Sequence, residues 1–339
     1  MGQPIRATLL IRQPEPLLTR TPVMGNKKVI AVAGATGAQG GGAARAILAD
    51  PESGFTVRAL TRNPDSPAAR ELASLGAEVV RADFDDEPTV HKAFEGAYGA
   101  FLVTNFWAHG SAAKEMEEIQ ALARAAAATG LSHVVWSTLE DTRELLPLED
   151  DRMPVLQEKY NVPHFDIKGE GNELFRQAGV PTTFLNTTFY FQGFLQGLGP
   201  QRGEDGVLTL SLPMEEGKLL AGVDVADIGR TAFAILKGGA PFVGQTIGLA
   251  GDHLTGAQYA EKLAAALGEP VRFQSVPYDF FRTLEIPLAE ELGNMFQYYG
   301  DFDQEFTGAR DLNRLREINP GLKSFDDWLA ENASKFELS

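Results

Sequence analysis

The chain has 339 residues, enough for one large α/β domain and a smaller lobe, and 44% of them are hydrophobic, which is ordinary for a globular protein. The formal net charge of −16 argues against non-specific binding to nucleic acid or to an anionic membrane. Because the chain has no cysteine, disulfides, thiolate catalysis and cysteine metal sites are excluded. The five histidines form no close pair with metal-ligand spacing, so no metal site is expected.

Residues 1–25 are expected to lie outside the fold. They contain arginines and four prolines, carry one acidic residue and show no hydrophobic periodicity. This composition favours a disordered extension or a start site called too early, with Met24 as the functional start; a transit peptide is the alternative. Arg6 stands where a myristoylation signal needs Ser or Thr, and no apolar run reaches the length of a membrane span. A cytoplasmic location is the default expectation.

The stretch 29–48 carries the most informative motif. An apolar run of β-branched residues and alanine, typical of a buried parallel strand, leads into three glycines and then an alanine-rich helix. Gly34 allows the tight turn out of the strand, Gly37 lets the backbone approach a pyrophosphate, and Gly40 lets the helix pack closely on the sheet. Free N–H groups and the positive dipole end of that helix attract phosphate charge.

This strand–loop–helix context predicts a dinucleotide site in a Rossmann-type α/β fold, with a doubly wound parallel sheet. Glycine spacing by itself is a weak signal, and a glycine-rich loop without a ligand is the alternative. The spacing G-x-x-G-x-x-G is one residue longer than the standard fingerprint. It resembles the form found in extended and atypical short-chain dehydrogenase/reductases.

The second strand, residues 55–60, indicates which dinucleotide the site prefers. It is followed by Thr61, Arg62 and Asn63, where the adenosine ribose lies in a doubly wound fold. An acidic residue there would bind the ribose 2′-hydroxyl, whereas an arginine accommodates a 2′-phosphate. Arg62 therefore favours NADP over NAD, with a solvated surface arginine as the alternative.

The third strand, residues 77–82, ends in Asp83 and Phe84, which are candidate adenine neighbours. Phe84 is equally compatible with a position in the core. We call this side of the expected site, with Arg62, the adenosine end.

The fourth strand, residues 97–103, is followed by Thr104 and Asn105, which are expected beside the nicotinamide half of the cofactor. Phe106 and Trp107 are expected to form a wall there. We call this side of the expected site the nicotinamide end.

The fifth strand, residues 133–137, ends in Ser137, where typical short-chain dehydrogenases have their catalytic serine, although a serine closing a strand is common. Residues 139–162 are acidic and punctuated by prolines, and are expected to form a loop over the site. We expect cofactor to order this loop and the aromatic stretch 189–194 over the nicotinamide end.

A helix from about His164 to Ala178 places His164 and Lys168 on one face, four residues apart. Gly169 and Gly171 each cost about 1 kcal/mol against alanine inside a helix. That cost indicates close packing at these positions, by a neighbouring helix or by the cofactor.

The character of the sequence changes after a sixth strand that begins at 181–186. The later expected elements are a strand at 207–212, a helix at 224–237, a last sheet strand at 245–250, a helix at 255–267, a loop, and a C-terminal helix capped by Ser324 with Asp327. Residues 26–186, with 224–250 returning to them, are expected to form the NAD(P)-binding domain. Residues 187–223 and 251–339 are expected to form a smaller α+β lobe, which we call the C-terminal lobe.

Several segments together resemble the NmrA-like family of atypical short-chain dehydrogenase/reductases, and most closely its animal branch, the NmrA-like family domain-containing NADPH-sensor proteins. The segments are Gly34-Ala-Thr-Gly37-Ala-Gln-Gly40, Thr61-Arg62-Asn63-Pro64, Val103-Thr104-Asn105-Phe106-Trp107, His164-Phe-Asp-Ile-Lys168, Leu210-Ser-Leu-Pro213, Val243-Gly-Gln-Thr-Ile-Gly-Leu249, Asn294-Met-Phe296 and Trp328-Leu329. The resemblance covers the chain from about Lys27 to its end.

The resemblance implies a protein that binds NADP(H) and whose self-association and binding to a regulatory protein partner respond to NADPH. Fungal relatives regulate a transcription factor by protein contact. The cofactor residues implied by motif are Gly34, Thr36, Gly37, Ala38, Gln39, Gly40, Arg62, Asp83, Phe84, Thr104, Asn105 and Lys168. One departure is that Asp65 and Ser66 replace the lysine-rich stretch that the animal sensors have after Arg-Asn-Pro, which weakens the expected selectivity for NADP.

The usual catalytic pair of this superfamily, Tyr-x-x-x-Lys, is missing from the sequence. His164 stands in place of the tyrosine, and Lys168 is retained. The favoured hypothesis is therefore a cofactor-binding redox sensor and regulator. The alternative is an NADPH-dependent reductase of quinones or unsaturated carbonyl compounds, in which Lys168 or His164 handles the proton.

Overall fold

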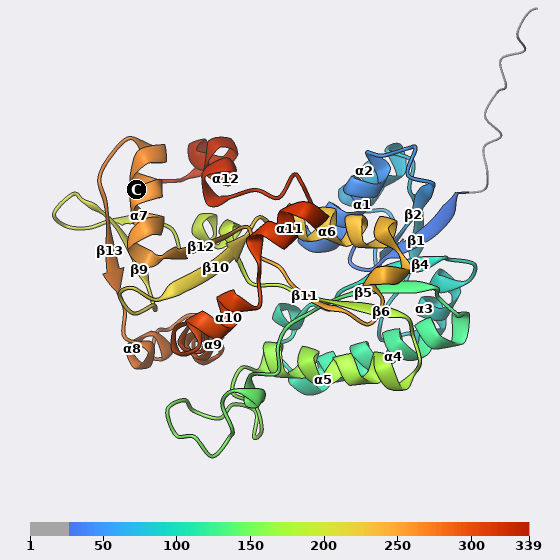
Figure 1. Cartoon of the computed structure of the whole chain (residues 1–339), viewed down its shortest axis with the longest axis horizontal. Coiled ribbons are helices and arrows are strands. Elements are labelled where there is room, and N and C mark those ends of the chain that lie inside the picture. The colour runs from blue at the N-terminus through green and yellow to red at the C-terminus, as the bar shows by residue number, and fades with distance from the viewer. Residues whose placement is uncertain (1–26, 339) are drawn as a thin grey trace, which may run out of the picture.

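The structure, a computed structural model, describes residues 27–338, so the expectations for residues 1–25 lie outside the described part of the chain. Figure 1 shows two groups of elements side by side. One group holds the long sheet with helices on both faces, and the other holds most of the C-terminal elements around two short sheets. None of the helices between residues 27 and 338 is both long and apolar enough to cross a bilayer.

The long sheet has seven strands, all parallel, and it confirms the predicted Rossmann-type doubly wound fold. In spatial order the strands are β11 (Thr246–Gly248), β6 (Thr182–Asn186), β5 (His133–Thr138), β4 (Gly99–Leu102), β1 (Lys28–Val32), β2 (Phe55–Thr61) and β3 (Glu78–Arg81). Every residue of β4, β5 and β6 is buried. Helices cover both faces of these strands, which buries even the polar residues at the ends of β5 and β6.

Two helical layers sandwich the sheet, as Figure 1 shows. One layer contains α1 (Ala38–Leu48), α2 (Pro67–Ser74) and α6 (Val225–Gly238), and the other contains α3 (Glu87–Phe94), α4 (Ala112–Thr129) and α5 (Pro163–Gln177). Helices α1 and α6 approach closely because both carry glycine at the crossing. A Cβ on Gly229 would lie 2.1 Å from the Ala43 nitrogen, so no larger residue fits there.

The second group of elements contains two three-stranded sheets and the remaining helices. One sheet has the order β12 (Asp252–Thr255), β10 (Leu219–Val223), β7 (Phe189–Tyr190), and the other has β13 (Val271–Ser275), β9 (Leu208–Leu212), β8 (Gln201–Arg202). The helices are α7 (Gly256–Leu267), α8 (Tyr278–Arg282), α9 (Ala289–Asp301), α10 (Asp303–Gly308), α11 (Leu312–Ile318) and α12 (Phe325–Asn332). Short 3₁₀ turns occur at Phe106–Ala108, Thr142–Glu144, Phe191–Leu195, Ala240–Phe242 and Ala333–Lys335.

The expected loop between 267 and 324 is wrong, because this segment contains β13 and the helices α8 to α11. Most of these helices are short, and α9 is buried on almost every side, including the polar residues Glu291, Asn294 and Gln297. A helix that buries polar side chains does not show the apolar stripe by which a sequence reveals a surface helix. The capping box of Ser324 and Asp327, in contrast, is confirmed at the start of α12.

The strand expected at 245–250 is confirmed as β11, which pairs with β6 at the edge of the long sheet. A later segment also returns to the long sheet. Leu315 and Leu322 pack in the core beneath α1 and α6 rather than with the other C-terminal elements. The division of the chain into a dinucleotide-binding domain and a C-terminal lobe stays a prediction.

Candidate functional site

The glycine loop after β1 has the geometry that phosphate binding requires. Gly34 has φ +59°, a left-handed conformation that side chains rarely adopt, and the Gly37 amide donates to its carbonyl at 2.8 Å. A Cβ on Gly40 would lie 2.4 Å from the carbonyl oxygens of both Ala33 and Gly34. Gly40 is therefore required for the helix to start directly against the loop.

The first turn of α1 offers free amides on an open surface. Gly37 precedes the helix without any side-chain cap, and the first turn contains no acidic residue. The amides of the first turn of a helix have no intrahelical acceptor, so those of Ala38, Gln39 and Gly40 are available to an anion. Thr36 and Ala38 are exposed beside them. This arrangement fits the pyrophosphate of a dinucleotide.

Gln39 links the loop to two distant segments. Ser137 at the end of β5 donates to the Gln39 Oε1 atom at 2.6 Å, and Gln39 Nε2 donates to the Tyr190 hydroxyl at 2.7 Å. Burial raises the pKa of Tyr190, which therefore stays a neutral phenol. The role of Tyr190 was not anticipated, because the sequence gives no sign that residue 190 returns to residue 39.

The aromatic stretch 189–194 was expected to cover the nicotinamide end, and for its phenylalanines this is wrong. Phe189, Phe191 and Phe194 are buried in the core of the C-terminal elements, where Phe194 lies 5.2 Å from Tyr259 between ring centroids. Tyr190 differs, because its hydroxyl accepts from Gln39 of the glycine loop. Large aromatic side chains contribute most when fully buried, and the three phenylalanines stabilise the core of the C-terminal elements.

The adenosine end is exposed. Arg62 follows β2, is solvent-exposed, and has no ion pair or side-chain hydrogen bond within the described residues. Asn63 holds the turn by accepting from the Asp65 amide at 3.1 Å. Asp65 lies close in sequence, but within the described residues its carboxylate forms no ion pair with Arg62. An exposed guanidinium of this kind is suited to a 2′-phosphate.

Asp83 and Phe84 lie at the same end with other roles in the local structure. The Asp83 side chain accepts from the Asp85 amide at 3.3 Å, and the Asp83 amide donates to Thr89 at 2.9 Å. Phe84 is half-buried and packs against the core under α3 and α4. Both residues therefore also stabilise the turn that follows β3.

At the nicotinamide end, Lys168 is already engaged with a buried carboxylate. Its Nζ atom donates to Thr104 Oγ1 at 2.7 Å and contacts Glu115, which is 0% exposed, while Lys168 itself is 8% exposed. The Thr104 hydroxyl also donates to Glu115. Asn105, by contrast, is exposed.

Glu115 was not anticipated as part of the site. It lies on α4, and nothing in the pattern of glutamates along that helix distinguishes the buried one. A second carboxylate on the same helix, Glu118, has its pKa raised to about 7 by burial and then by the negative charge of Glu115. His109 approaches Glu118 to 3.9 Å.

His164 lies in the first turn of α5 and is bound to α9. Its Nδ1 atom donates to Glu291 of α9, and its backbone amide donates to the same carboxylate oxygen at 2.9 Å. Its ring lies 4.8 Å from Trp107 and 5.8 Å from Phe106 between centroids. Of the expected aromatic wall, Trp107 is 47% exposed, whereas Phe106 is fully buried beneath it.

The glycines of α5 serve helix packing and loop contact. A Cβ on Gly171 would lie 2.9 Å from Ile119 of α4, and one on Gly169 would lie 2.7 Å from the Asp141 amide. Of the two expected neighbours, a helix or the cofactor, the helix applies to Gly171. Gly169 packs instead against loop 139–162, which was not expected.

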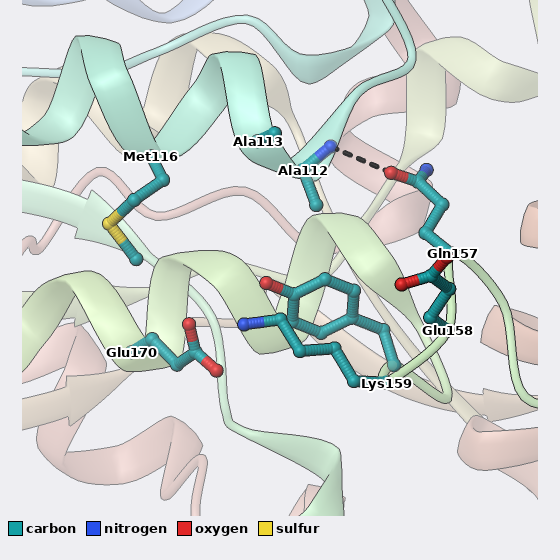
Figure 2. Close-up of a pocket in the computed structure, with 8 residues that line it drawn as sticks. Ala112, Ala113, Met116, Gln157, Glu158, Lys159 and Glu170 are labelled. Atoms are coloured by element: carbon teal, nitrogen blue, oxygen red, sulfur yellow. Dashed lines mark hydrogen bonds between the residues drawn. The ribbon is translucent and has the colours of Figure 1, made fainter.

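The loop 139–162 is anchored beside the nicotinamide end, at the segment before α4 and at the first residue of α4. That the loop covers a bound cofactor stays a prediction. Gln157 accepts from the Ala112 amide at 2.9 Å and donates to the Gly110 carbonyl at 2.9 Å, as Figure 2 shows for Ala112. Beside it lies an open cavity of about 560 Å³. The cavity is lined by Ala112, Ala113, Met116, Gln157, Glu158, Lys159, Tyr160 and Glu170.

The sheet, the glycine loop and the open first turn of α1 define a Rossmann-type protein with a phosphate-binding loop. A comparison with models of known protein families then identifies the family. Residues 26–329 match the model of the NmrA-like family, and the chain belongs to this family. The resemblance to the NmrA-like family found in the sequence is thereby confirmed, and its closeness to the animal branch stays a prediction.

Relatives agree with this assignment. The oxidoreductase hkm9 of Aspergillus hancockii, an NmrA-like family domain-containing protein, is 30% identical over 322 residues, which cover 87% of this chain and 92% of that protein. FrzB of Cladobotryum sp, named in the same way, is 34% identical over 199 residues, which cover 55% of this chain and only 56% of that protein.

Two solved structures show the shared fold. NmrA, a negative transcriptional regulator crystallised with NADP, has a TM-score of 0.75 at 24% identity and covers 91% of this chain and 95% of its own. Triphenylmethane reductase from Citrobacter sp., complexed with NADP(H), has a TM-score of 0.70 at 18% identity and covers 90% of this chain and 99% of its own. At these identities the likeness concerns the fold.

Proposed function

We propose that this chain binds NADP(H) and acts as a redox sensor that regulates a protein partner. The proposal rests on the contrast between the phosphate-binding side of the site and its nicotinamide end. The phosphate-binding side offers the free amides of α1 and the exposed Arg62, whereas Lys168 is already neutralised by the buried Glu115. Such a site is built to hold the dinucleotide, and it lacks the Tyr-x-x-x-Lys pair of a typical reductase.

The residues that hold the cofactor in this proposal are those of the glycine loop (Gly34, Thr36, Gly37, Ala38, Gln39 and Gly40), Arg62, Asp83, Phe84, Thr104, Asn105 and Lys168. NADP(H) would supply a ring that is positively charged when oxidised and neutral when reduced. A regulator can respond to that difference of one charge without carrying out any reaction. Self-association and a cytoplasmic location belong to the same proposal.

A reductase is the second candidate, and His164 favours it. Its Nδ1 atom is bound to Glu291, an arrangement that fixes the ring and leaves Nε2 as the group that could hold a proton. The relatives FrzB and hkm9, which are named oxidoreductases, and the structural neighbour triphenylmethane reductase support the same candidate.

One experiment separates the two candidates. NADPH and NADH are titrated against the protein by fluorescence, and NADPH absorbance is then followed with a panel of quinones and aldehydes. We expect tight NADPH binding without turnover. Turnover that disappears in the variant His164→Asn would instead favour the reductase, and the absence of binding to either dinucleotide would contradict both candidates.

A further inference from the structure

One face of α9 holds the loop over the nicotinamide end. Glu291, Asn294 and Gln297 are three residues apart, which places them on one face of the helix, and all three are buried. Asn294 Nδ2 donates to the carbonyls of Pro154 at 2.8 Å and Asn161 at 2.6 Å. Gln297 Nε2 donates to the carbonyl of Arg152 at 2.9 Å, so three polar side chains bind loop 139–162 and α5.

These contacts are costly to leave unmade. Asn294 and Glu291 are at most 3% exposed, and a buried polar group that loses its partner costs about 1–3 kcal/mol. The backbone of the two segments that these contacts join, loop 139–162 and the start of α9, is also strained. The non-glycine residues with positive φ within residues 27–338 are Gln157 (44°) and Glu158 (71°) in the loop, and Leu288 (58°) at the start of α9.

Strain of this kind persists only where surrounding contacts enforce it, and it is concentrated at binding sites and switching segments. Here the contacts of both strained segments converge on the backbone at Gly110 and Ala112. Gln157 binds the backbone at Gly110 and Ala112, and the Leu288 side chain packs against Gly110. The loop, the segment after β4 and the start of α9 are therefore held together around the nicotinamide end.

Glu291 connects α9 to the nicotinamide end through His164. Its carboxylate accepts from both the ring and the amide of His164, and the His164 ring lies against the exposed Trp107. A charge on a ligand at the nicotinamide end acts on this carboxylate through a partly buried environment, where charges are weakly screened. A cationic ligand is attracted, and a neutral one is not.

We propose that Glu291 is the positioning residue through which the chain distinguishes oxidised from reduced cofactor and passes the difference to α9. The inference rests on the proposed binding of NADP(H). Because coupling is reciprocal, a ligand or protein that displaces α9 changes the ratio of the two cofactor affinities by the same factor. The partner of the regulator would thus act through α9.

The test compares the dissociation constants of NADP⁺ and NADPH in the wild-type protein, E291Q, E291D and the control E290Q. Glu290 is the exposed neighbour of Glu291 in the same turn of α9. Removing the negative charge in E291Q is expected to weaken NADP⁺ relative to NADPH by about two- to five-fold. E291D, which keeps the charge, is expected to restore the wild-type ratio, and E290Q to leave it unchanged.

Hydrogen exchange of the wild-type protein tests the inference without any substitution. Residues 152–161 and 288–301 are expected to exchange at different rates with NADP⁺ and with NADPH, while residues 34–41 are protected equally by both. Equal exchange of α9 in the two complexes, or an E291Q ratio that matches E290Q, overturns the inference and leaves cofactor binding intact. Failure of the wild-type protein to bind either cofactor overturns the proposed function as well.

Discussion

The two ends of the candidate site are built in opposite ways. At the phosphate loop and Arg62 the binding groups are backbone amides and one exposed guanidinium, and within residues 27–338 none of them has a side-chain partner. At the nicotinamide end Lys168 and His164 are already bound to other side chains: Lys168 to Glu115 and Thr104, and His164 to Glu291.

The two ends differ in the contacts that hold their binding groups in place. At the phosphate end the binding groups lie at the ends of β1 and β2 and are backbone amides and one exposed side chain, although Ser137 and Tyr190 hold Gln39 from distant segments. The nicotinamide end joins α4, α5 and α9, so a change there disturbs the fold as well as the ligand. Substitutions should therefore separate binding from stability at the first end and fail to separate them at the second.

The largest expected effect is at the phosphate loop. The variant Gly37→Val should lose measurable binding of both NADPH and NADH, because a side chain there would stand between the amides and the pyrophosphate. The fold should survive, since a Cβ on Gly37 would lie 3.2 Å from the Gly34 carbonyl, a contact that a small shift relieves. Fluorescence titration measures the affinity, and circular dichroism checks the fold. Unchanged NADPH affinity in the variant would contradict the proposed phosphate-binding site.

The next effect is on stability at the nicotinamide end. Glu115→Gln removes one partner of a buried ion pair and leaves the Lys168 charge uncompensated, which should cost about 3 kcal/mol in the free energy of unfolding. The exposed pair of Arg45 and Glu71 supplies the control, because Glu71→Gln should cost less than about 1 kcal/mol. Urea denaturation measures both. Equal costs in the two variants would remove the contrast between the ends.

Arg62→Ala should weaken NADPH binding by about ten-fold and leave NADH nearly unchanged. The preference of the wild-type protein for NADPH should shrink at high salt, because Arg62 is exposed. Arg70→Ala, an exposed arginine on the following helix, is the control. If Arg62→Ala weakens both dinucleotides equally, Arg62 shapes the loop and the assignment to NADP loses its main support.

The smallest effect concerns Glu118. Burial raises the pKa of its carboxyl group to about 7. Between its ordinary pKa and 7 the folded protein binds more protons than the unfolded chain, so stability should fall as pH rises from about 4.5 to 7. Glu118→Gln should remove this part of the pH dependence and add about 1 kcal/mol at pH 8, after allowance for solvent screening. Glu117→Gln, an exposed neighbour, is the control in thermal unfolding at pH 5 and pH 8; equal profiles for the two variants would contradict the assignment.

Much of the fold was predictable because its signals are local. The strand–glycine loop–helix of residues 28–48, the cap of α12, and the strand that became β11 each depend on residues close together in sequence. The glycines of α5 were recognised as points of close packing, but only the structure shows that Ile119 and Asp141 are the neighbours.

The sequence by itself determined the Rossmann-type fold class, the phosphate loop and the position of Arg62 after the second strand, since these follow from the local succession of strands, glycines and helices along the chain. Only the tertiary structure decided which polar and charged side chains are paired. Glu115, Tyr190 and Glu291 reach their partners Lys168, Gln39 and His164 across 53, 151 and 127 positions of the chain. A single sequence carries no local sign of such contacts, because burial and pairing of a polar side chain depend on elements that meet only after the chain has folded.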